Sequence, residues 1–259
     1  MAFKFASLGS GSQGNGLLVS SSKTSLLVDC GFSTVETERR LHRLSVTPES
    51  VDAILVTHEH GDHVGGVAGL AKKYSIPIFC TPGTLIGSPS LEGLDHIVNI
   101  NSYSAFVIQD LVIQPFPVPH DAREPSQFTV TYGKEKLGVL TDCGSITPHM
   151  KEQLSGCSAL FIEFNHDAEM LKRSHYPSSL KARITGGYGH INNSEAINLL
   201  ECVKGPELRY VVAAHLSKEN NDPQLVRSMI SRSLGWCEEQ VDIATQECGQ
   251  DWRVLDDSE

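Results

Sequence analysis

Thr57-His58-Glu59-His60-Gly61-Asp62-His63 is the stretch of this sequence that decides the fold. It places three imidazoles and a carboxylate directly after the apolar run Ala53-Ile54-Leu55-Val56. A loop that follows a buried strand can turn such side chains toward one point. Imidazole and carboxylate suit zinc, iron or manganese, and the lack of thiolates argues against a purely structural zinc. The stretch predicts a metal site, with a chance cluster of surface histidines as the alternative.

Three further candidate ligands lie downstream, and each follows a predicted strand. They are His120 in PVPHDA, Asp142 in VLTDCG and His215 in VVAAHLS. Any one of them alone is more often a hydrogen-bonded structural group than a ligand. Together with the first stretch, they complete the number of ligands that two metal ions need.

Length and composition narrow the class of protein. The chain has 259 residues, 21 Lys and Arg, 31 Asp and Glu, and a net charge of −10. Its 40% apolar content excludes a disordered chain. The acidic balance argues against a protein coated in basic charge for nucleic acid, although it leaves room for a local basic patch. Because no linker or repeat is evident, we expect one domain over residues 1–259.

Targeting and redox signals are also informative. No run approaches the roughly 18 apolar residues that a membrane span needs, and the N-terminus does not have the pattern of a secretory signal. The seven cysteines are odd in number and form no CxxC pair. We therefore expect free, buried thiols in a cytoplasmic protein without membrane contact.

Apolar alternation and turn residues predict strands first, and then strands mixed with helices. The expected strands are 3–8, 17–20, 25–28, 53–56, 76–80, 96–99, 105–108, 112–116, 128–132, 136–140, 159–163, 210–214 and 241–244. The expected helices are 35–44, 64–74, 167–173, 178–184, 194–203 and 223–234. This order predicts an α/β (α+β) fold of two sheets with outer helices, not a repeated βαβ barrel.

Gly9-Ser10-Gly11-Ser12-Gln13-Gly14 matches the G-x-G-x-x-G pattern of dinucleotide-binding loops. That interpretation requires a helix after the glycines. A strand-like LLVS follows instead. We therefore interpret the stretch as a flexible turn between two strands, and we expect no organic cofactor.

The motif HxHxDH, followed by single His, Asp and His ligands, resembles the metallo-β-lactamase superfamily over residues 29–215. Finer motifs resemble its YycJ/WalJ-type branch, which comprises bacterial cytoplasmic proteins regarded as phosphodiesterases or DNA exonucleases. These motifs are SLGSGSQGNGLLV, LLVDCG, EFNHD, YPSSLKARI, GHINN and AHLSKENN. The resemblance implies a metallo-β-lactamase-like αββα sandwich, with two mixed β-sheets flanked by helices.

The resemblance also implies a division of the ligands between two divalent ions. His58, His60 and His120 would hold one ion, Asp62, His63 and His215 would hold the other, and Asp142 would bridge them. Zinc is the first expectation for the metal, with manganese or iron as alternatives. Asp62 would in addition accept a hydrogen bond from the nucleophile. Asp29 and His166 would support the site from behind, with a plain structural role as the alternative for Asp29 and contact with the substrate as the alternative for His166.

His190 lies in the glycine-rich segment GGYGHINN, just before the expected helix 194–203. In related ribonuclease Z and phosphodiesterase groups, a histidine in a Gly-His context binds the scissile phosphate or protonates the leaving oxygen. The resemblance implies that role for His190, with a helix-capping histidine as the alternative. Four nearby cations, which could instead form a solvated helix face, are expected to bind phosphate: Lys172, Arg173, Lys181 and Arg183.

The expected reaction is attack of a metal-bound hydroxide on a phosphodiester, with DNA as substrate and, by resemblance, 5′-to-3′ exonuclease action. Hydrolysis of a small ester, thioester, lactone or cyclic phosphate is the alternative within enzymes. A non-catalytic metal-bound sensor or scaffold is the alternative outside them. The oligomeric state is not readable from the sequence.

Overall fold

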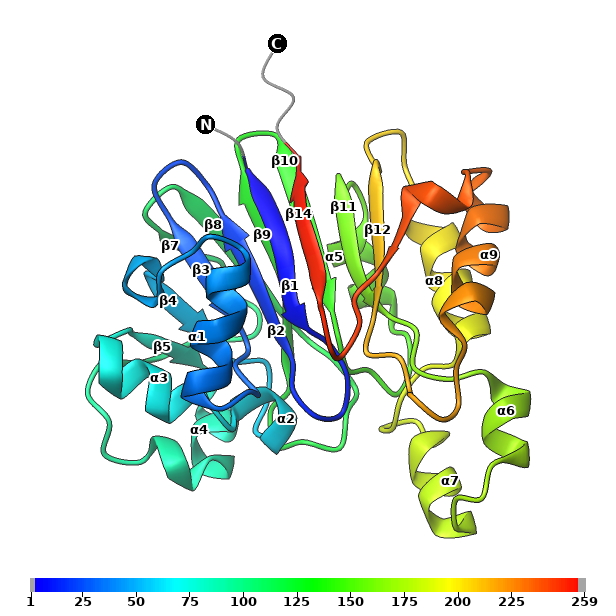
Figure 1. Cartoon of the computed structure of the whole chain (residues 1–259), viewed down its shortest axis with the longest axis horizontal. Helices are drawn as coiled ribbons and strands as arrows, with labels where there is room; N and C mark the ends of the chain where they lie inside the picture. The colour runs from blue at the N-terminus through cyan, green and yellow to red at the C-terminus, as the bar shows by residue number, and fades with distance from the viewer. Residues whose placement is uncertain (1–2, 256–259) are drawn as a thin grey trace.

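The computed structural model describes residues 3–255, whose strands form two seven-stranded sheets (Figure 1). In spatial order, the first sheet contains β14 (Gln250–Val254), β1 (Lys4–Gly9), β2 (Gly16–Ser20), β3 (Ser25–Val28), β4 (Ala53–Leu55), β5 (Ile78–Cys80) and β6 (Ile97–Asn99). The second contains β13 (Val241–Ile243), β12 (Tyr210–Ala214), β11 (Ala159–Glu163), β10 (Glu135–Leu140), β9 (Ser126–Tyr132), β8 (Leu111–Pro117) and β7 (Phe106–Ile108). Both sheets are mixed, because β3 to β6 and β10 to β13 pair in parallel and the remaining pairs are antiparallel.

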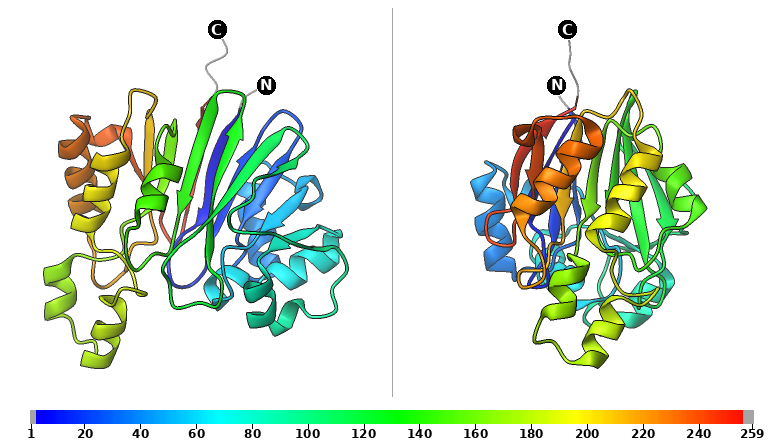
Figure 2. Two further views of the ribbon diagram at one scale, coloured as in Figure 1. Left: turned by 180° about the vertical axis from the view of Figure 1, so that it is seen from behind. Right: turned by 90° about the vertical axis from the view of Figure 1, so that its right-hand side faces the viewer.

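Helices cover the outer faces of the two sheets (Figures 1 and 2). On the side of the first sheet lie α1 (Thr34–Arg43), α2 (Gly61–Val64), α3 (Val67–Tyr74), α4 (Pro82–Gly87) and the short turns η1 (Pro48–Ser50) and η2 (Pro89–Leu91). On the side of the second lie α5 (Pro148–Leu154), α8 (Asn193–Val203), α9 (Pro223–Leu234) and η3 (Glu238–Gln240). A pair of short helices, α6 (Ala168–Arg173) and α7 (Ser178–Ile184), projects from the body at the lower right of Figure 1.

Strand alternation explains the layers. In β3, Leu26 and Val28 point into the core between the sheets, while Leu27 points into the core beneath the helices of the first sheet. Successive side chains of a strand face opposite sides, so a strand covered on both faces is apolar throughout. A third core joins the second sheet to α5, α8 and α9. The expected sandwich of two mixed sheets between helices is confirmed.

Several details differ from the sequence-based expectation. The expected helix 64–74 is divided into α2 and α3 at Gly65 and Gly66, where a Cβ on Gly66 would lie 1.8 Å from the carbonyl oxygen of Phe32. The elements α4, α5 and β14 were not expected. All seven cysteines are free, as expected, but three of them are exposed, so the expectation of burial is wrong for these: Cys202, Cys237 and Cys248.

The ends of the expected domain, residues 1–2 and 256–259, lie outside the described residues. Within residues 3–255, no helix combines the length and the apolar character that a bilayer-spanning segment needs.

Candidate metal centre

The seven candidate ligands come together at one edge of the sandwich. Each follows the carboxyl end of a strand: His58, His60, Asp62 and His63 after β4, His120 after β8, Asp142 after β10, and His215 after β12. The carboxyl ends of the parallel strands in the two sheets meet at this edge, which brings distant parts of the sequence together. His215 has a left-handed backbone with φ of 53°, a conformation that a residue other than glycine seldom adopts. Such local strain at a ligand is typical of functional sites.

Three imidazoles form the first group. Nδ1 of His60 lies 3.0 Å from Nε2 of His58 and 3.3 Å from Nε2 of His120. Burial lowers the pKa of His58 well below its usual range, and burial also lowers the pKa of His120. Both rings therefore favour the neutral form, which is the form that binds a metal ion.

Asp62, His63 and His215 form the second group. Oδ2 of Asp62 lies 3.4 Å from Nε2 of His63 and 3.6 Å from Nε2 of His215. Although burial opposes protonation, Asp142 and Asp62 raise the pKa of His215 to about 10. The carboxylates thus favour a positive charge at this position, whether a proton or a metal ion supplies it.

Asp142 lies between the two groups. Its Oδ2 lies 2.8 Å from Nε2 of His63, and its Oδ1 lies 3.9 Å from Nε2 of His120. Oδ2 is buried and, despite this close contact to His63, has no hydrogen-bond partner within residues 3–255. A buried carboxylate oxygen without a hydrogen bond is costly. A cation between the groups would satisfy this oxygen.

In four of the candidate histidine ligands, the ring nitrogen that faces away from the centre forms a hydrogen bond. These bonds show whether the opposite nitrogens are free to bind metal ions. Each outward-facing nitrogen donates to an oxygen: Nδ1 of His120 to the Gly189 carbonyl, Nε2 of His60 to the Asp121 carbonyl, Nδ1 of His63 to Asp29, and Nδ1 of His215 to Glu163. Each bond fixes the tautomer in which the opposite nitrogen presents its lone pair to the centre. Metal-binding histidines are held in this way. The residues therefore fit divalent ions.

Asp29 holds the loop that carries the first ligands. Its Oδ1 accepts from the backbone N–H of Thr57 at 2.8 Å, and its Oδ2 accepts from the Thr57 hydroxyl and from His63, both at 2.8 Å. Asp29 is buried and has a left-handed backbone with φ of 61°. The structure thus places Asp29 behind His63, where it orients the ring.

Glu163 is a site residue that the sequence motifs did not indicate. It is the last residue of β11 and is fully buried. Its Oε1 lies 2.7 Å from Nδ1 of His190 and 3.2 Å from Nδ1 of His215. Although burial disfavours the charged ring, Glu163 raises the pKa of His190 above its usual value. The signal in the sequence was an acid at the end of a strand in EFNHD, three residues before His166.

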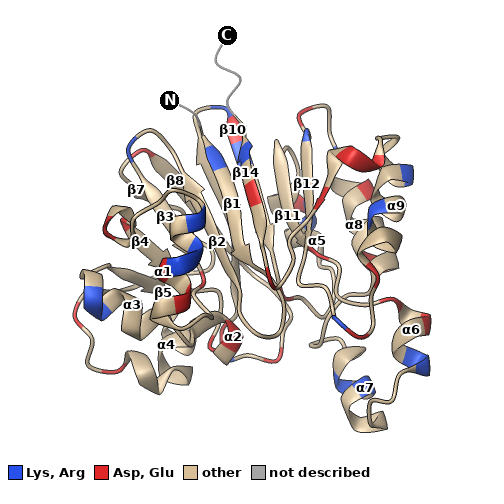
Figure 3. Ribbon diagram, in the orientation of Figure 1, with Lys and Arg blue, Asp and Glu red and all other residues tan. Residues whose placement is uncertain are grey.

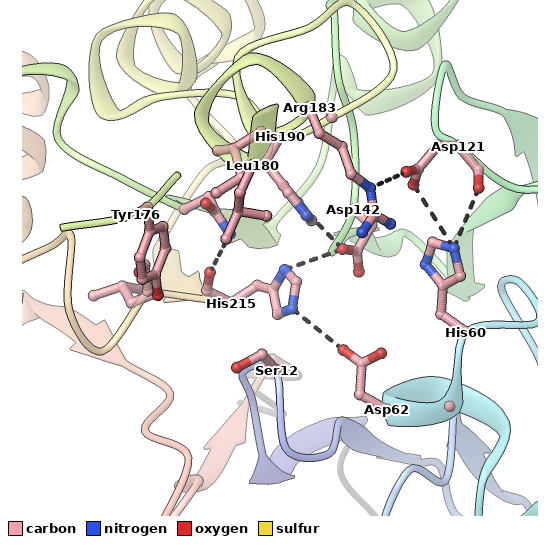
Figure 4. Close-up of a pocket in the computed structure, with 16 residues that line it drawn as sticks. Ser12, His60, Asp62, Asp121, Asp142, Tyr176, Leu180, Arg183, His190 and His215 are labelled. Carbon is pink, nitrogen blue, oxygen red and sulfur yellow. Dashed lines mark hydrogen bonds and ion pairs between the residues drawn. The ribbon is translucent and has the colours of Figure 1, made fainter. Parts of the chain in front are cut away.

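A cavity of about 430 Å³ opens beside the centre (Figure 4). Its polar wall includes Asp62, Asp142, His190 and His215. The cavity thus joins the candidate metal ligands to the Glu163–His190 pair, an arrangement that suits hydrolysis of a substrate that carries negative charge.

Comparisons with known proteins agree with this geometry. Residues 24–215 match the family model described as the beta-lactamase superfamily domain. The chain belongs to this superfamily.

Two relatives of this superfamily member cover nearly its whole length. The exodeoxyribonuclease YycJ of Bacillus anthracis is 35% identical over 243 residues, which are 90% of each chain. The exodeoxyribonuclease WalJ of Streptococcus pneumoniae is 31% identical and covers 100% of this chain and 95% of its own. The fold is also that of YhfI from Bacillus subtilis, with a TM-score of 0.76, 17% identity, and coverage of 98% of this chain and 100% of YhfI. This member of the superfamily is a metal-dependent hydrolase.

The four cations expected to bind phosphate lie on α6 and α7, and they differ in placement (Figure 3). Arg183 lines the cavity and donates to Asp121 at 2.6 Å. Nζ of Lys181 donates to the carbonyls of Lys172 and Ser174 at 2.8 and 2.7 Å. Lys172 and Arg173 lie on the exposed side of α6, each 3.7 Å from Glu169. Of the four, Arg183 is brought to the cavity.

His166 is buried, and its ring contacts Asn165 rather than a candidate ligand. Asn165 provides the link to the centre, because its Nδ2 donates to the carbonyl of His215 at 3.1 Å and the residue lines the cavity. The N-terminus of α8 is occupied by its own cap, in which Asn192 and Glu195 accept the free N–H groups. The helix end near His190 is therefore not open to a phosphate.

The glycine-rich turn between β1 and β2 supports the centre. The hydroxyl of Ser10 accepts from the backbone N–H of His215 at 2.9 Å and donates to Asn15 at 3.1 Å. Nδ2 of Asn15 in turn lies 3.3 Å from Oδ2 of Asp62. The turn therefore positions two candidate ligands, His215 and Asp62. The G-x-G-x-x-G pattern does not indicate this supporting role.

Proposed function

We propose that this protein is a DNA exonuclease that hydrolyses phosphodiester bonds with two divalent ions, zinc first, with manganese or iron as alternatives. The observation that carries the proposal is the position of Asp142. Its oxygens lie between the two groups of candidate ligands, beside the Glu163–His190 pair. The names of the YycJ and WalJ relatives support DNA as the substrate and an end as the point of attack. The 5′-to-3′ direction rests on the family resemblance.

His58, His60 and His120 would hold one ion, and Asp62, His63 and His215 the other, with Asp142 shared. When bound, such ions supply positive charge for phosphate oxygens and lower the pKa of a water molecule. Asp62 is partly exposed at the cavity and can also accept a hydrogen bond from the attacking water.

His190 is positioned to protonate the leaving oxygen. Its Nδ1 is bound by Glu163, so Nε2 is the nitrogen left for a substrate in the cavity. A histidine that is protonated near neutral pH is an effective general acid. Glu163 holds the ring in place and keeps the proton on it, which makes Glu163 a positioning residue.

One assay panel tests the proposal. The metal-loaded protein is offered end-labelled DNA, end-labelled RNA, bis-p-nitrophenyl phosphate, a thioester and a lactone, with His58→Ala as the inactive control. We expect release of nucleotides from DNA, and His190→Ala should cut turnover while leaving the metal content intact. Unchanged turnover in His190→Ala would remove its catalytic role. Hydrolysis of only the thioester or lactone would refute the proposal.

A hydrolase of small phosphodiesters is a second candidate, because the cavity of about 430 Å³ has the size of a small-molecule site. It would cleave bis-p-nitrophenyl phosphate and leave DNA intact. A non-catalytic sensor would bind metal and turn over none of the five substrates.

A further inference from the structure

The cavity has a second wall whose chemistry differs from that of the metal ligands. Tyr176, in the link between α6 and α7, lines it together with Leu180 and Ile184 of α7 (Figure 4). Leu216, next to the candidate ligand His215, continues this wall. One side of the cavity is therefore charged and the other is largely apolar.

Leu216 packs against the core of the second sheet, but the part of this wall that α7 and Tyr176 form does not belong to a core. None of the seven residues of α7 is buried. Tyr176, Leu180 and Ile184 are half-buried, and within residues 3–255 they belong to none of the three core clusters. These side chains present apolar surface to the cavity, and a ligand that covers this surface would remove it from water, which is favourable.

Polar contacts hold this wall in place. Lys181 ties α7 to the end of α6 through the carbonyls of Lys172 and Ser174, and Arg183 ties α7 to Asp121 beside the centre. The backbone N–H of Tyr176 donates to the hydroxyl of Ser174 at 3.4 Å. The wall is thus a fixed platform, so binding against it would lose little conformational freedom.

A phosphodiester that also carries a flat apolar group matches both walls. A nucleotide has this chemistry, because its base has an aromatic face and its phosphate is anionic. The cavity has the size of a site for one small ligand, so it would take one unpaired nucleotide and not a base pair. Base stacking on an aromatic side chain tolerates every base, because each has such a face.

We propose that Tyr176, Leu180 and Ile184 form the binding site for the terminal base, with Tyr176 as the stacking residue. The inference rests on the proposed exonuclease function and adds that the end must be unpaired and that its base, not only its phosphate, is bound. Tyr176 is then a determinant of substrate affinity and not a catalytic residue.

The test compares two single-stranded oligonucleotides with wild-type protein, one of which lacks the base at the attacked end. We expect KM to be roughly 5- to 150-fold higher for the abasic end, with kcat little changed, since stacking acts equally in ground and transition states. Tyr176→Ala should raise KM for the normal end by a similar factor and no longer distinguish the two substrates. Tyr176→Phe should behave as wild type.

Tyr103→Ala is the matched control, because Tyr103 is 71% exposed and does not line this cavity. Equal KM for normal and abasic ends with wild-type protein would overturn the inference and leave the exonuclease proposal standing. A more than tenfold preference for one end base would also overturn it, because it would indicate hydrogen-bond readout. Absence of any release from DNA would refute the proposed function and this inference together.

Discussion

Glu163→Gln removes one charge from beneath the centre while keeping the shape of the side chain. Oε1 of Glu163 faces His190 at 2.7 Å and His215 at 3.2 Å, and Oε2 accepts from the backbone N–H of Cys143 at 3.1 Å. An amide oxygen can still accept the backbone hydrogen bond. The substitution therefore acts mainly on the two histidines.

The two contacts predict two separable effects. A hydrogen bond to a charged group contributes about 1.5–3 kcal/mol, and tenfold in rate corresponds to about 1.4 kcal/mol. If His190 donates its proton in the rate-limiting step, kcat/KM on DNA should fall about 10- to 150-fold. Loss of the support for His215 should weaken metal binding by about 10- to 100-fold, as is typical of residues behind a metal ligand.

The assay separates these effects through the metal concentration and the leaving group. Rates are measured while the metal is raised until they stop increasing, and the bound metal is determined by elemental analysis. At saturating metal, the defect on DNA should remain, because a nucleotide hydroxyl leaves poorly without a proton. The defect on bis-p-nitrophenyl phosphate should be much smaller, because p-nitrophenolate leaves without one.

The double variant Glu163→Gln/His190→Ala completes the test. If Glu163 acts on catalysis through His190, the double variant should be no slower on DNA than His190→Ala alone, whereas its weaker metal binding should persist. Full activity of Glu163→Gln on DNA at saturating metal would refute this reasoning. Equal losses on DNA and on bis-p-nitrophenyl phosphate would also refute it, since they would indicate a general distortion of the site.

Three further outcomes are expected. Gly31→Ala would place its Cβ 1.8 Å from the carbonyl oxygen of Asp62, so it should lower both metal content and melting temperature; Gly61→Ala, whose Cβ meets nothing within 4 Å, should retain its metal. Hydrogen bonds from Arg39 lower the pKa of Glu36 to about 2. Wild type should therefore be more stable than Glu36→Gln by the full amount above pH 4.5, and this difference should vanish as the pH falls toward 2. Thermal unfolding at a series of pH values measures it. A thiol reagent at pH 7.5 should label three cysteines in the native protein and seven after unfolding. Burial hides the other four thiols and raises their pKa, so mass spectrometry should find them protected in the native protein: Cys30, Cys80, Cys143 and Cys157.

The layers could be predicted from the sequence, and the candidate ligands could be selected from it, because both steps depend on local patterns. The continuous apolar run Leu26-Leu27-Val28 indicates a strand covered on both faces, and that is how β3 lies. A candidate ligand just after an apolar strand, such as Asp142, can be selected without knowing its partners. Such features depend on residues close together in the chain.

Features that depend on distant residues were missed. Glu163 and His190 are 27 positions apart, and their contact arises because β11 ends beside the loop that precedes α8. The edge strand β14 was missed because its partner β1 lies at the opposite end of the chain, with Lys4 opposite Val254. The charge pattern on α6 and α7 likewise did not reveal that Lys181 is bound by backbone carbonyls.

The net charge of −10 is compatible with a DNA substrate because of where the carboxylates lie. Asp29, Asp62, Asp142 and Glu163 are gathered in or beneath the centre, where two divalent ions would add four positive charges that the residue count omits. Elsewhere basic and acidic side chains are interspersed (Figure 3). A basic surface for duplex DNA is therefore not needed if the proposed enzyme holds one unpaired end in its cavity. Binding of this kind involves few phosphates, and few counterions would be released.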